Sequence, residues 1–190
     1  MRKQRLLIML SVIVIGVLPF TGCKKSVGTP EDNATKEAPE EVAEEEAFLI
    51  GFSAINMENP YFITLESAAR QVLEEEGHKM ITKDPKTDPE AQASQIREMI
   101  EEGIDAIILS PVDWEAITPS LQELKEAGVR IINADTQVKE MDYIDVYIGS
   151  DNYKAGAICG EDLLERCPDG GKVALLECPT QNSINERITG

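Results

Sequence analysis

The stretch Ser53–Phe62, which reads SAINMENPYF, joins two patterns of different period. The residues before it, Phe48–Phe52, form a short apolar run that is typical of a buried strand. The residues after it repeat apolar side chains at helical spacing as far as Glu76. Asn59 followed by Pro60 predicts a helix start, because Asn accepts hydrogen bonds from unpaired amides and Pro has no amide to leave unpaired. The loop therefore lies where open α/β sheets bind ligands. The alternative is a purely structural role, in which Asn59 only caps the helix and Tyr61 and Phe62 pack under the loop.

The same strand–helix unit repeats along the rest of the chain. We expect strands over residues 48–53, 79–83, 105–109, 129–134, 144–148 and 172–177, and helices over 60–76, from Asp88-Pro89 to Gly103, from Asp113 to Ala127, over 152–166 and from about Asn182. Pro119 lies inside the third helical pattern and should bend that helix or cost it a hydrogen bond. Alternation of this length predicts an α/β fold, a doubly wound parallel sheet with helices on both faces.

Polar side chains gather at the carboxyl ends of the expected strands, whereas Gly and Glu occupy the opposite ends. These carboxyl ends carry Ser53 to Asn59, Asp84, Ser110-Pro111 and Asp135-Thr136. This asymmetry predicts a site for a small ligand. The loops contain neither a G-x-G-x-x-G nor a Walker A motif, which argues against a nucleotide.

An extracytoplasmic enzyme would have to use Asp84, Asp135 or Glu177. No nucleophile has a base beside it, and no motif places a second carboxylate near these three. We therefore predict a binding protein without catalytic residues.

The composition excludes several further classes. The chain of 190 residues carries a net charge of −17, which disfavours binding to nucleic acid. His78 is the single histidine, so neither a zinc site nor a histidine triad is expected, and no cofactor is predicted. Cys159, Cys167 and Cys178 could form one disulfide and leave one thiol free, although Cys159, in a helical pattern, also fits a small buried hydrophobe.

The first 47 residues are predicted to be a secretion signal followed by a tether. Residues 1–22 combine a basic start with an apolar run, as a secretory signal does. The end of this segment, Phe20–Cys23, resembles a lipobox, so Cys23 is the expected lipidation site. The alternatives to a lipoprotein signal are an ordinary secretory signal with a stray cysteine and an uncleaved membrane anchor. Residues 23–47 are acidic and lack apolar periodicity, which predicts a disordered tether outside the cytoplasmic membrane.

A set of motifs resembles one family. Asn59–Phe62, Asp105–Pro111, Gly128–Asp135, Tyr147–Gly156 and Asn185–Arg187 follow each other as in the ribose-binding-protein-like, sugar-binding lipoproteins of ABC importers. The ligand domain of LacI-type repressors shares this core. We favour a transport protein over a repressor, because the chain has a predicted secretion signal and no helix-turn-helix pattern.

The resemblance implies a periplasmic binding protein type I-like fold that closes two lobes around a monosaccharide. It implies that Asn59 and Asp135 hydrogen-bond sugar hydroxyls and that Arg187 donates from the second lobe. Further ligand-binding residues by resemblance are Tyr61 and Phe62 as aromatic faces, together with Ser53, Ser110 and Thr136. Thr136 stands where the ribose-type pattern has Arg, so the Arg side chain that would donate hydrogen bonds is missing. The candidate ligands therefore include pentoses, hexoses, polyols and furanone-type signals. Trp114 is either another stacking surface or a packing residue.

By the same resemblance, residues 48–149 form the N-terminal lobe and residues 150–190 begin a second, truncated lobe. We expect this chain alone to bind sugar weakly or not at all. Its expected partners are a small-molecule sugar, an ABC permease and, through the lipid anchor, the membrane, with the protein itself a monomer. The alternatives are a sensor that passes a ligand signal to a membrane kinase or chemoreceptor, and a non-functional remnant.

Overall fold

The computed structural model describes residues 47–190, so the predicted signal peptide, Cys23 and almost all of the predicted tether lie outside the described residues. The elements are β1 (Leu49–Ser53), α1 (Pro60–Glu75), β2 (Lys79–Lys83), α2 (Pro89–Glu102), β3 (Ala106–Leu109), α3 (Thr118–Glu126), β4 (Arg130–Ala134), the short 3-10 helix η1 (Met141–Tyr143), β5 (Val146–Ile148), α4 (Asn152–Arg166) and α5 (Asn182–Thr189). Among the helices of this part, none has both the length and the apolar character needed to span a bilayer.

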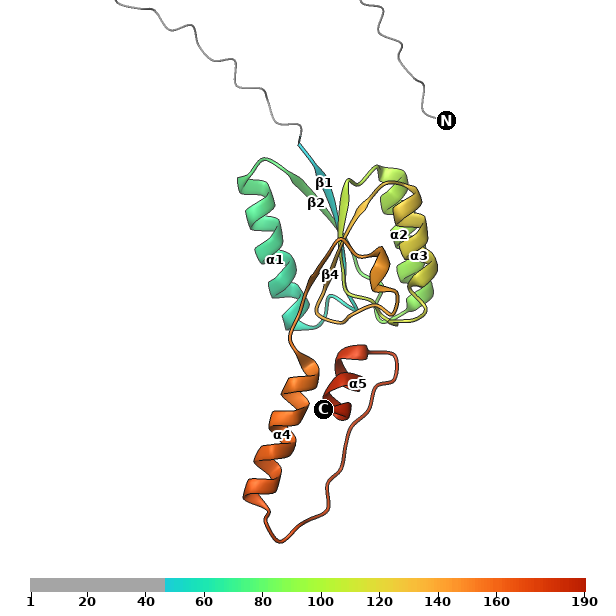
Figure 1. The fold of residues 1–190 in the computed structure, drawn as a ribbon. Coiled ribbons are helices and arrows are strands. Elements are labelled where there is room, and N and C mark those ends of the chain that lie inside the picture. Colours follow the sequence, from blue (N-terminus) through green and yellow to red (C-terminus); the bar gives the residue numbers. More distant parts are fainter. Residues whose placement is uncertain (1–46) are drawn as a thin grey trace, which may run out of the picture. The chain divides into compact units, whose positions relative to one another are not determined.

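All five strands of the sheet run parallel in the order β2-β1-β3-β4-β5. Helix α1 covers one face, and α2 and α3 cover the other (Figure 1). The predicted doubly wound parallel sheet is therefore confirmed. Because the chain steps from β1 to β2 on one side and then to β3 on the other, the loops after β1 and β3 diverge, and this divergence is where such sheets bind ligands.

A separate apolar core lies on each face of the sheet. Phe52 and Phe62 belong to the cluster beneath α1. Ile107, Leu121 and Leu124 belong to the cluster beneath α2 and α3. Each helix thus buries its apolar stripe against the strands, and this burial fixes where its first turn meets the strand ends.

The predicted helix boundaries are confirmed for α1 and α2. The Asn59 side chain accepts a hydrogen bond from the Tyr61 amide at 3.0 Å, and the Asp88 side chain accepts from the Glu90 amide at 2.9 Å. Gly103, which ends α2, has a φ of 83°, in the left-handed region that glycine reaches without strain.

The start of α3 differs from the prediction. The Asp113 side chain accepts hydrogen bonds from the Glu115 and Ala116 amides, both at 2.9 Å, but it caps a separate turn and not the helix. Helix α3 begins at Thr118, so Pro119 is its second residue. At that position a missing amide costs nothing, and the predicted bend was wrong.

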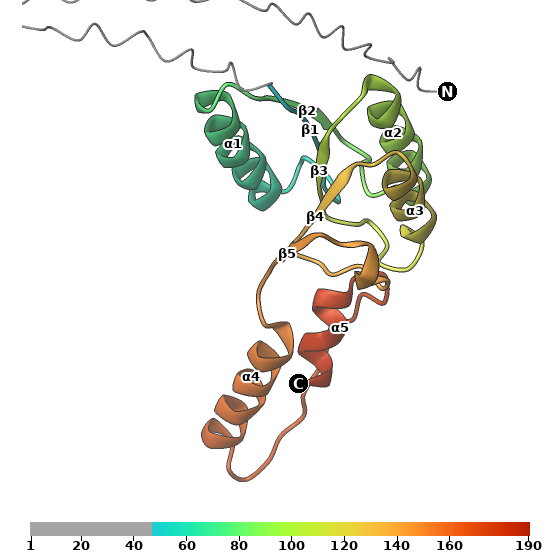
Figure 2. The same cartoon turned by 45° about the horizontal axis from the view of Figure 1, so that its top comes forward.

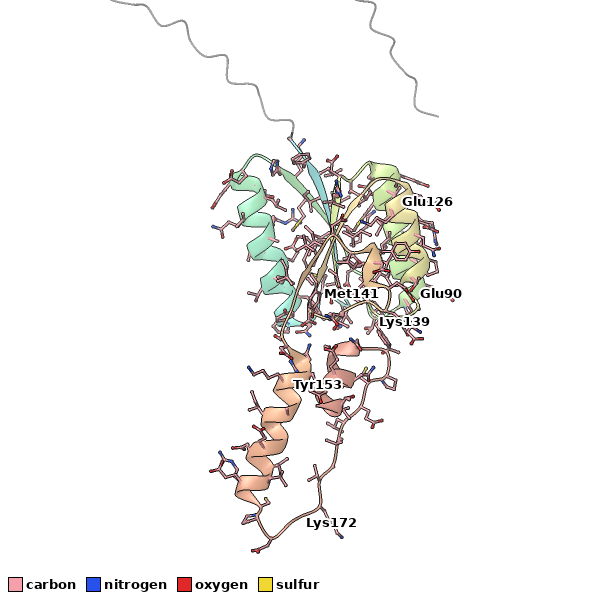
Figure 3. All side chains as sticks on the ribbon, viewed as in Figure 1. Glu90, Glu126, Lys139, Met141, Tyr153 and Lys172 are labelled. Atoms are coloured by element: carbon pink, nitrogen blue, oxygen red, sulfur yellow. The ribbon has the colours of Figure 1, made fainter. Side chains whose placement is uncertain are left out.

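The predicted strand over 172–177 was also wrong. These residues are extended but pair with no strand among the described residues, and Leu176 is 92 % exposed. Figure 3 shows Lys172 on the extended stretch that returns to α5. An apolar run can form a strand only beside a partner whose backbone groups complete the ladder. Cys159, in α4, is exposed, not buried as its helical position suggested, and all three described cysteines are free.

Asp145 joins three elements next to β5. Its carboxylate accepts hydrogen bonds from the Lys125 ammonium at 2.8 Å, the Ile131 amide at 2.8 Å and the Arg130 guanidinium at 3.0 Å. The Lys125 bond, followed by the Ile131 amide and Arg130, lowers the pKa of Asp145 from 3.8 to about 2. The folded state therefore favours the ionised carboxylate.

This pKa shift predicts an acid-dependent stability term. The stabilisation is complete above the unfolded pKa of 3.8, shrinks as pH falls toward the folded pKa of about 2, and is lost below it. Asp145→Asn should lower the free energy of unfolding at pH 7 and flatten its dependence on pH across this interval, as urea denaturation at several pH values can measure. Asp142→Asn, which changes an exposed carboxylate in η1, is the control. Equal pH profiles for the two variants would contradict the assignment.

Candidate functional site

A polar cavity of about 460 Å³ lies between the strand-end loops and the first turns of α5. Figure 2 shows α5 beside the carboxyl-end loops of the sheet. The cavity brings together five of the residues predicted from the sequence: Asn59, Tyr61, Phe62, Asp135 and Arg187. Its other polar lining residues are Asn56, Thr87, Ser150, Gln181 and Ser183.

The loop after β1 supplies two amide side chains. The Asn56 Oδ1 atom accepts from the Glu58 and Asn59 amides at 3.2 and 2.9 Å, and the Asn59 Oδ1 atom accepts from the Tyr61 amide. These bonds fix both side chains by their oxygen ends. In the described part of the chain, neither NH₂ group has a hydrogen-bond partner. Asn59 therefore caps α1 and still presents donors to the cavity.

Tyr61 and Phe62 contribute unequal aromatic surfaces. Their ring centroids are 5.1 Å apart with an interplanar angle of 76°, an edge-to-face contact. Phe62 is 3 % exposed and belongs to the core, whereas Tyr61 is 52 % exposed. Burial, followed by the charge of Asp135, raises the pKa of the Tyr61 hydroxyl. Tyr61 is thus the aromatic side chain with surface free for a ligand, and it keeps its proton as a donor.

Asp135 lies directly after β4 in an unusual backbone conformation. Its φ of 66° is left-handed, a region that residues other than glycine seldom adopt. The Asp135 amide donates to the Ile148 carbonyl at 2.8 Å, and the Tyr147 hydroxyl donates to the Asp135 carbonyl at 2.8 Å. These bonds to β5 hold the carboxylate at the cavity wall.

The environment of Asp135 both raises and lowers the pKa of its carboxyl group. Burial raises the pKa of this group, while the Thr136 hydroxyl, the charge of Arg187 and the Tyr61 hydroxyl oppose the rise. The partly buried carboxylate is therefore a strong acceptor for hydroxyl donors, because hydrogen bonds to an ionised group are the stronger ones.

Asn133, a buried residue of β4, shapes the loop that carries Asp135. Its Nδ2 atom donates to the Leu109 and Thr136 carbonyls at 3.1 and 2.8 Å, and its Oδ1 atom accepts from the Val138 amide at 3.2 Å. This role of Asn133 was not predicted from the sequence. A polar residue inside an otherwise apolar strand is the signal that could have indicated it.

The opposite wall comes from α5 and the turn before it. Arg187 is exposed and lines the cavity. The Ser183 hydroxyl lies 2.9 Å from that of Thr136, and the Trp114 amide donates to the Thr180 carbonyl at 3.0 Å. Thr136 is fully buried and contacts α5, and it does not line the cavity. The Trp114 ring contacts the Lys139 ammonium at 6.0 Å and is likewise absent from the cavity wall.

Ser53 and Ser110 are also buried and outside the cavity wall. The fully buried Gln92 of α2 joins them, because its Nε2 atom donates to the Ser53 hydroxyl and to the Ser110 carbonyl, each at 3.1 Å. Its Oε1 atom accepts from the Val112 amide at 2.9 Å. The structure therefore places both serines in the support of the strand-end loops, and their direct contact with a ligand stays a prediction.

A larger, mostly apolar hollow lies along α4, the extended segment over residues 170–175 and α5. Its walls include Leu163, Leu164 and Leu175, which are exposed. We assign no ligand to it, because its walls include the apolar run for which a strand was expected. The chemistry of the polar cavity is the better guide to function.

A doubly wound sheet whose strand-end loops line a polar cavity has the geometry of a protein that binds a small polar ligand. The chain belongs to the periplasmic binding protein family, since residues 50–190 match the family described as a periplasmic binding protein domain. This finding confirms the family resemblance of the sequence motifs.

Curated relatives and solved structures agree with the family. The ribose import binding protein RbsB of Bacillus subtilis is 28 % identical over 153 residues, which cover 80 % of this chain and 50 % of that protein. An ABC transporter solute-binding protein from Mycobacterium smegmatis with bound glycerol is 26 % identical, with a TM-score of 0.68 over 76 % of this chain and 50 % of that one. A Caulobacter myo-inositol binding protein, at 20 % identity and a TM-score of 0.70 over 79 % of this chain and 51 % of that one, supports the fold alone.

The chain spans about half the length of the curated relatives it matches. These relatives are binding proteins and not enzymes, which agrees with the prediction for this chain. Periplasmic binding proteins act outside the cytoplasmic membrane, as expected from the sequence.

Gly156 in α4 sets the position of Arg187 by backbone contact. A β-carbon at Gly156 would collide with the backbone carbonyl of Arg187, whereas one at Gly160, one turn further along, would meet nothing within 4 Å. Gly156→Ala should therefore displace α5 and accelerate amide hydrogen exchange over residues 182–189, with a net loss of about 1–3 kcal/mol in stability.

Gly160→Ala is the matched control, because both substitutions gain the same helix propensity, about 1 kcal/mol. Only the change at Gly156 adds a clash. Unchanged exchange in α5 for both variants would show that this contact does not position Arg187.

Proposed function

We propose that this chain forms the ligand-capturing part of an extracytoplasmic sugar-binding protein that serves an ABC importer. The observation that carries the proposal is the polar cavity in which the Asp135 carboxylate and the Arg187 guanidinium share an otherwise uncharged lining with Tyr61. A neutral ligand with several hydroxyl groups suits this lining, because the two formal charges balance and the remaining groups are amides, hydroxyls and an aromatic ring.

The roles follow from the hydrogen-bonding capacity of each group. The Asp135 carboxylate accepts from ligand hydroxyls without requiring a cation. Arg187 donates from α5, and the NH₂ groups of Asn56 and Asn59 donate from the loop after β1. Tyr61 offers its exposed ring to the apolar C–H face of a pyranose or furanose.

The ligands named for the relatives support a small polyhydroxylated ligand. They include ribose and xylose, and a Mycobacterium smegmatis protein of 26 % identity is in complex with β-D-fucofuranose. Thr136, which follows the strand-end carboxylate, is buried against Ser183 and adds no donor to the cavity.

The division into lobes is part of the proposal. We assign residues 48–149 to the first lobe and residues 150–190 to the start of the second, with the crossing between β5 and α4. Since the relatives are about twice as long, the described cavity corresponds to part of a complete site. We therefore expect this chain alone to bind its sugar with a dissociation constant in the millimolar range, about 4 kcal/mol of binding free energy.

Attachment through a lipid on Cys23, a monomeric state and delivery to an ABC permease complete the proposed role. Lipidation would hold the protein at the membrane surface while the acidic tether keeps the folded part in water. Mass spectrometry of the protein isolated from membranes tests this anchor, since an acylated N-terminal Cys23 is expected and an unmodified one would contradict it.

The binding function is tested by NMR titration of the chain with D-ribose, L-arabinose, D-galactose and myo-inositol. One of these sugars should shift the resonances of the cavity residues, and Asp135→Asn should weaken its binding at least tenfold, because the variant replaces a charged acceptor by a neutral amide. Asp142→Asn, at a residue that does not line the cavity, should bind as the unmodified chain does. Shifts that are absent, or equal in both variants, would argue against the proposed site.

A further inference from the structure

The loop between β2 and α2 contains two consecutive residues with left-handed backbones. The φ angles of Lys86 and Thr87 are 52° and 66°. A branched β-carbon makes this conformation especially unfavourable for Thr87. A strained residue of this kind persists only where its surroundings hold it, and such residues concentrate at ligand sites.

Hydrogen bonds from two sides hold this loop. The Asp84 Oδ1 atom accepts from the Met57 amide at 3.1 Å and from the Lys86 amide at 3.0 Å. The Thr87 amide donates to the Ile55 carbonyl at 2.9 Å. These bonds attach the loop after β2 to the loop after β1, so the two loops form one continuous wall. The predicted strand-end residue Asp84 therefore acts as an anchor and does not itself line the cavity.

The consequence of this attachment is the placement of one side chain. Thr87 lines the polar cavity together with Asn56 and Asn59, whereas its strained neighbour Lys86 does not. The Thr87 residue is exposed, and its hydroxyl has no hydrogen-bond partner among the described residues. Both residues have a strained backbone, so strain alone does not identify a ligand contact. Only Thr87 lines the cavity, and this position distinguishes it from Lys86.

We propose that Thr87 is a ligand-contacting residue that determines specificity in this site. Its hydroxyl exchanges a hydrogen bond with a ligand hydroxyl, and its methyl group limits the room beside Asn56 and Asn59. This inference rests on the proposed sugar-binding function and extends it to a loop for which the sequence predicted only a strand-end carboxylate.

The test uses three variants of the chain and the same four probes, D-ribose, L-arabinose, D-galactose and myo-inositol. Thr87→Val keeps the branched shape and removes the hydroxyl, Thr87→Ser keeps the hydroxyl, and Lys86→Gly relaxes the neighbouring backbone outside the cavity. Dissociation constants come from NMR titration, and thermal melting of each variant reports whether the fold is intact.

Thr87→Val should weaken binding of the preferred probe about threefold to tenfold, the effect of losing one neutral hydrogen bond, and should change the ratio of affinities among the four probes. Lys86→Gly should bind within about twofold of the unmodified chain, at the level of a surface substitution. Thr87→Ser should bind the preferred probe more tightly than Thr87→Val, because it keeps the hydroxyl, and should change the ratio of affinities among the four probes, because it loses the methyl group. None of the three should melt at a markedly lower temperature, since none removes a bond that holds the loop.

Three results would overturn the inference. If Thr87→Val binds within twofold of the unmodified chain while Asp135→Asn loses binding, the site is real and Thr87 does not contact the ligand. If Lys86→Gly weakens binding as much as Thr87→Val, the shape of the loop matters and the hydroxyl does not. If no probe shifts any cavity resonance in the unmodified chain, the proposed function fails and this inference fails with it.

Discussion

Backbone groups that leave a buried sheet must still be hydrogen-bonded, and two buried amide side chains meet this requirement here. Gln92 joins the end of β1 to the loop after β3, and Asn133 closes the loop after β4 onto the end of β3. An apolar side chain at either position would leave loop carbonyls or amides unpaired in the interior. This buried support lies at the strand ends from which the loop carrying Asn56 and Asn59, and Asp135, continue to the cavity wall.

The arrangement of the sheet and of the helices that cover it was largely predictable from the sequence. Apolar periodicity, the Asn59-Pro60 and Asp88-Pro89 starts and the glycines after the helices are local signals, and the structure follows them within one or two residues. The two failures have a shared cause. Where α3 begins, and whether residues 172–177 pair, depend on neighbours in space, which a local pattern does not contain.

The candidate site was predictable in part. Asn59, Tyr61, Asp135 and Arg187 were found because their residue types and positions resemble a family, and the structure gathers them at one cavity. Ser53, Ser110 and Thr136 fit the same reasoning but are buried, since a strand-end position does not reveal whether a short side chain points into the wall or out of it. The sequence did not indicate Thr87 or Ser183 as cavity residues. The left-handed φ of Thr87 and the approach of α5, which carries Ser183, are features of the three-dimensional structure.

The bonds between Asp135 and β5 have a mechanical consequence. The backbone of Asp135 is attached at its amide to Ile148 and at its carbonyl to the Tyr147 hydroxyl, while Gly149 packs against both Tyr147 and the Asp135 carbonyl. The next residues of the chain lead into α4. A displacement of the Asp135 backbone therefore also moves the end of β5, and with it the residues that lead into α4.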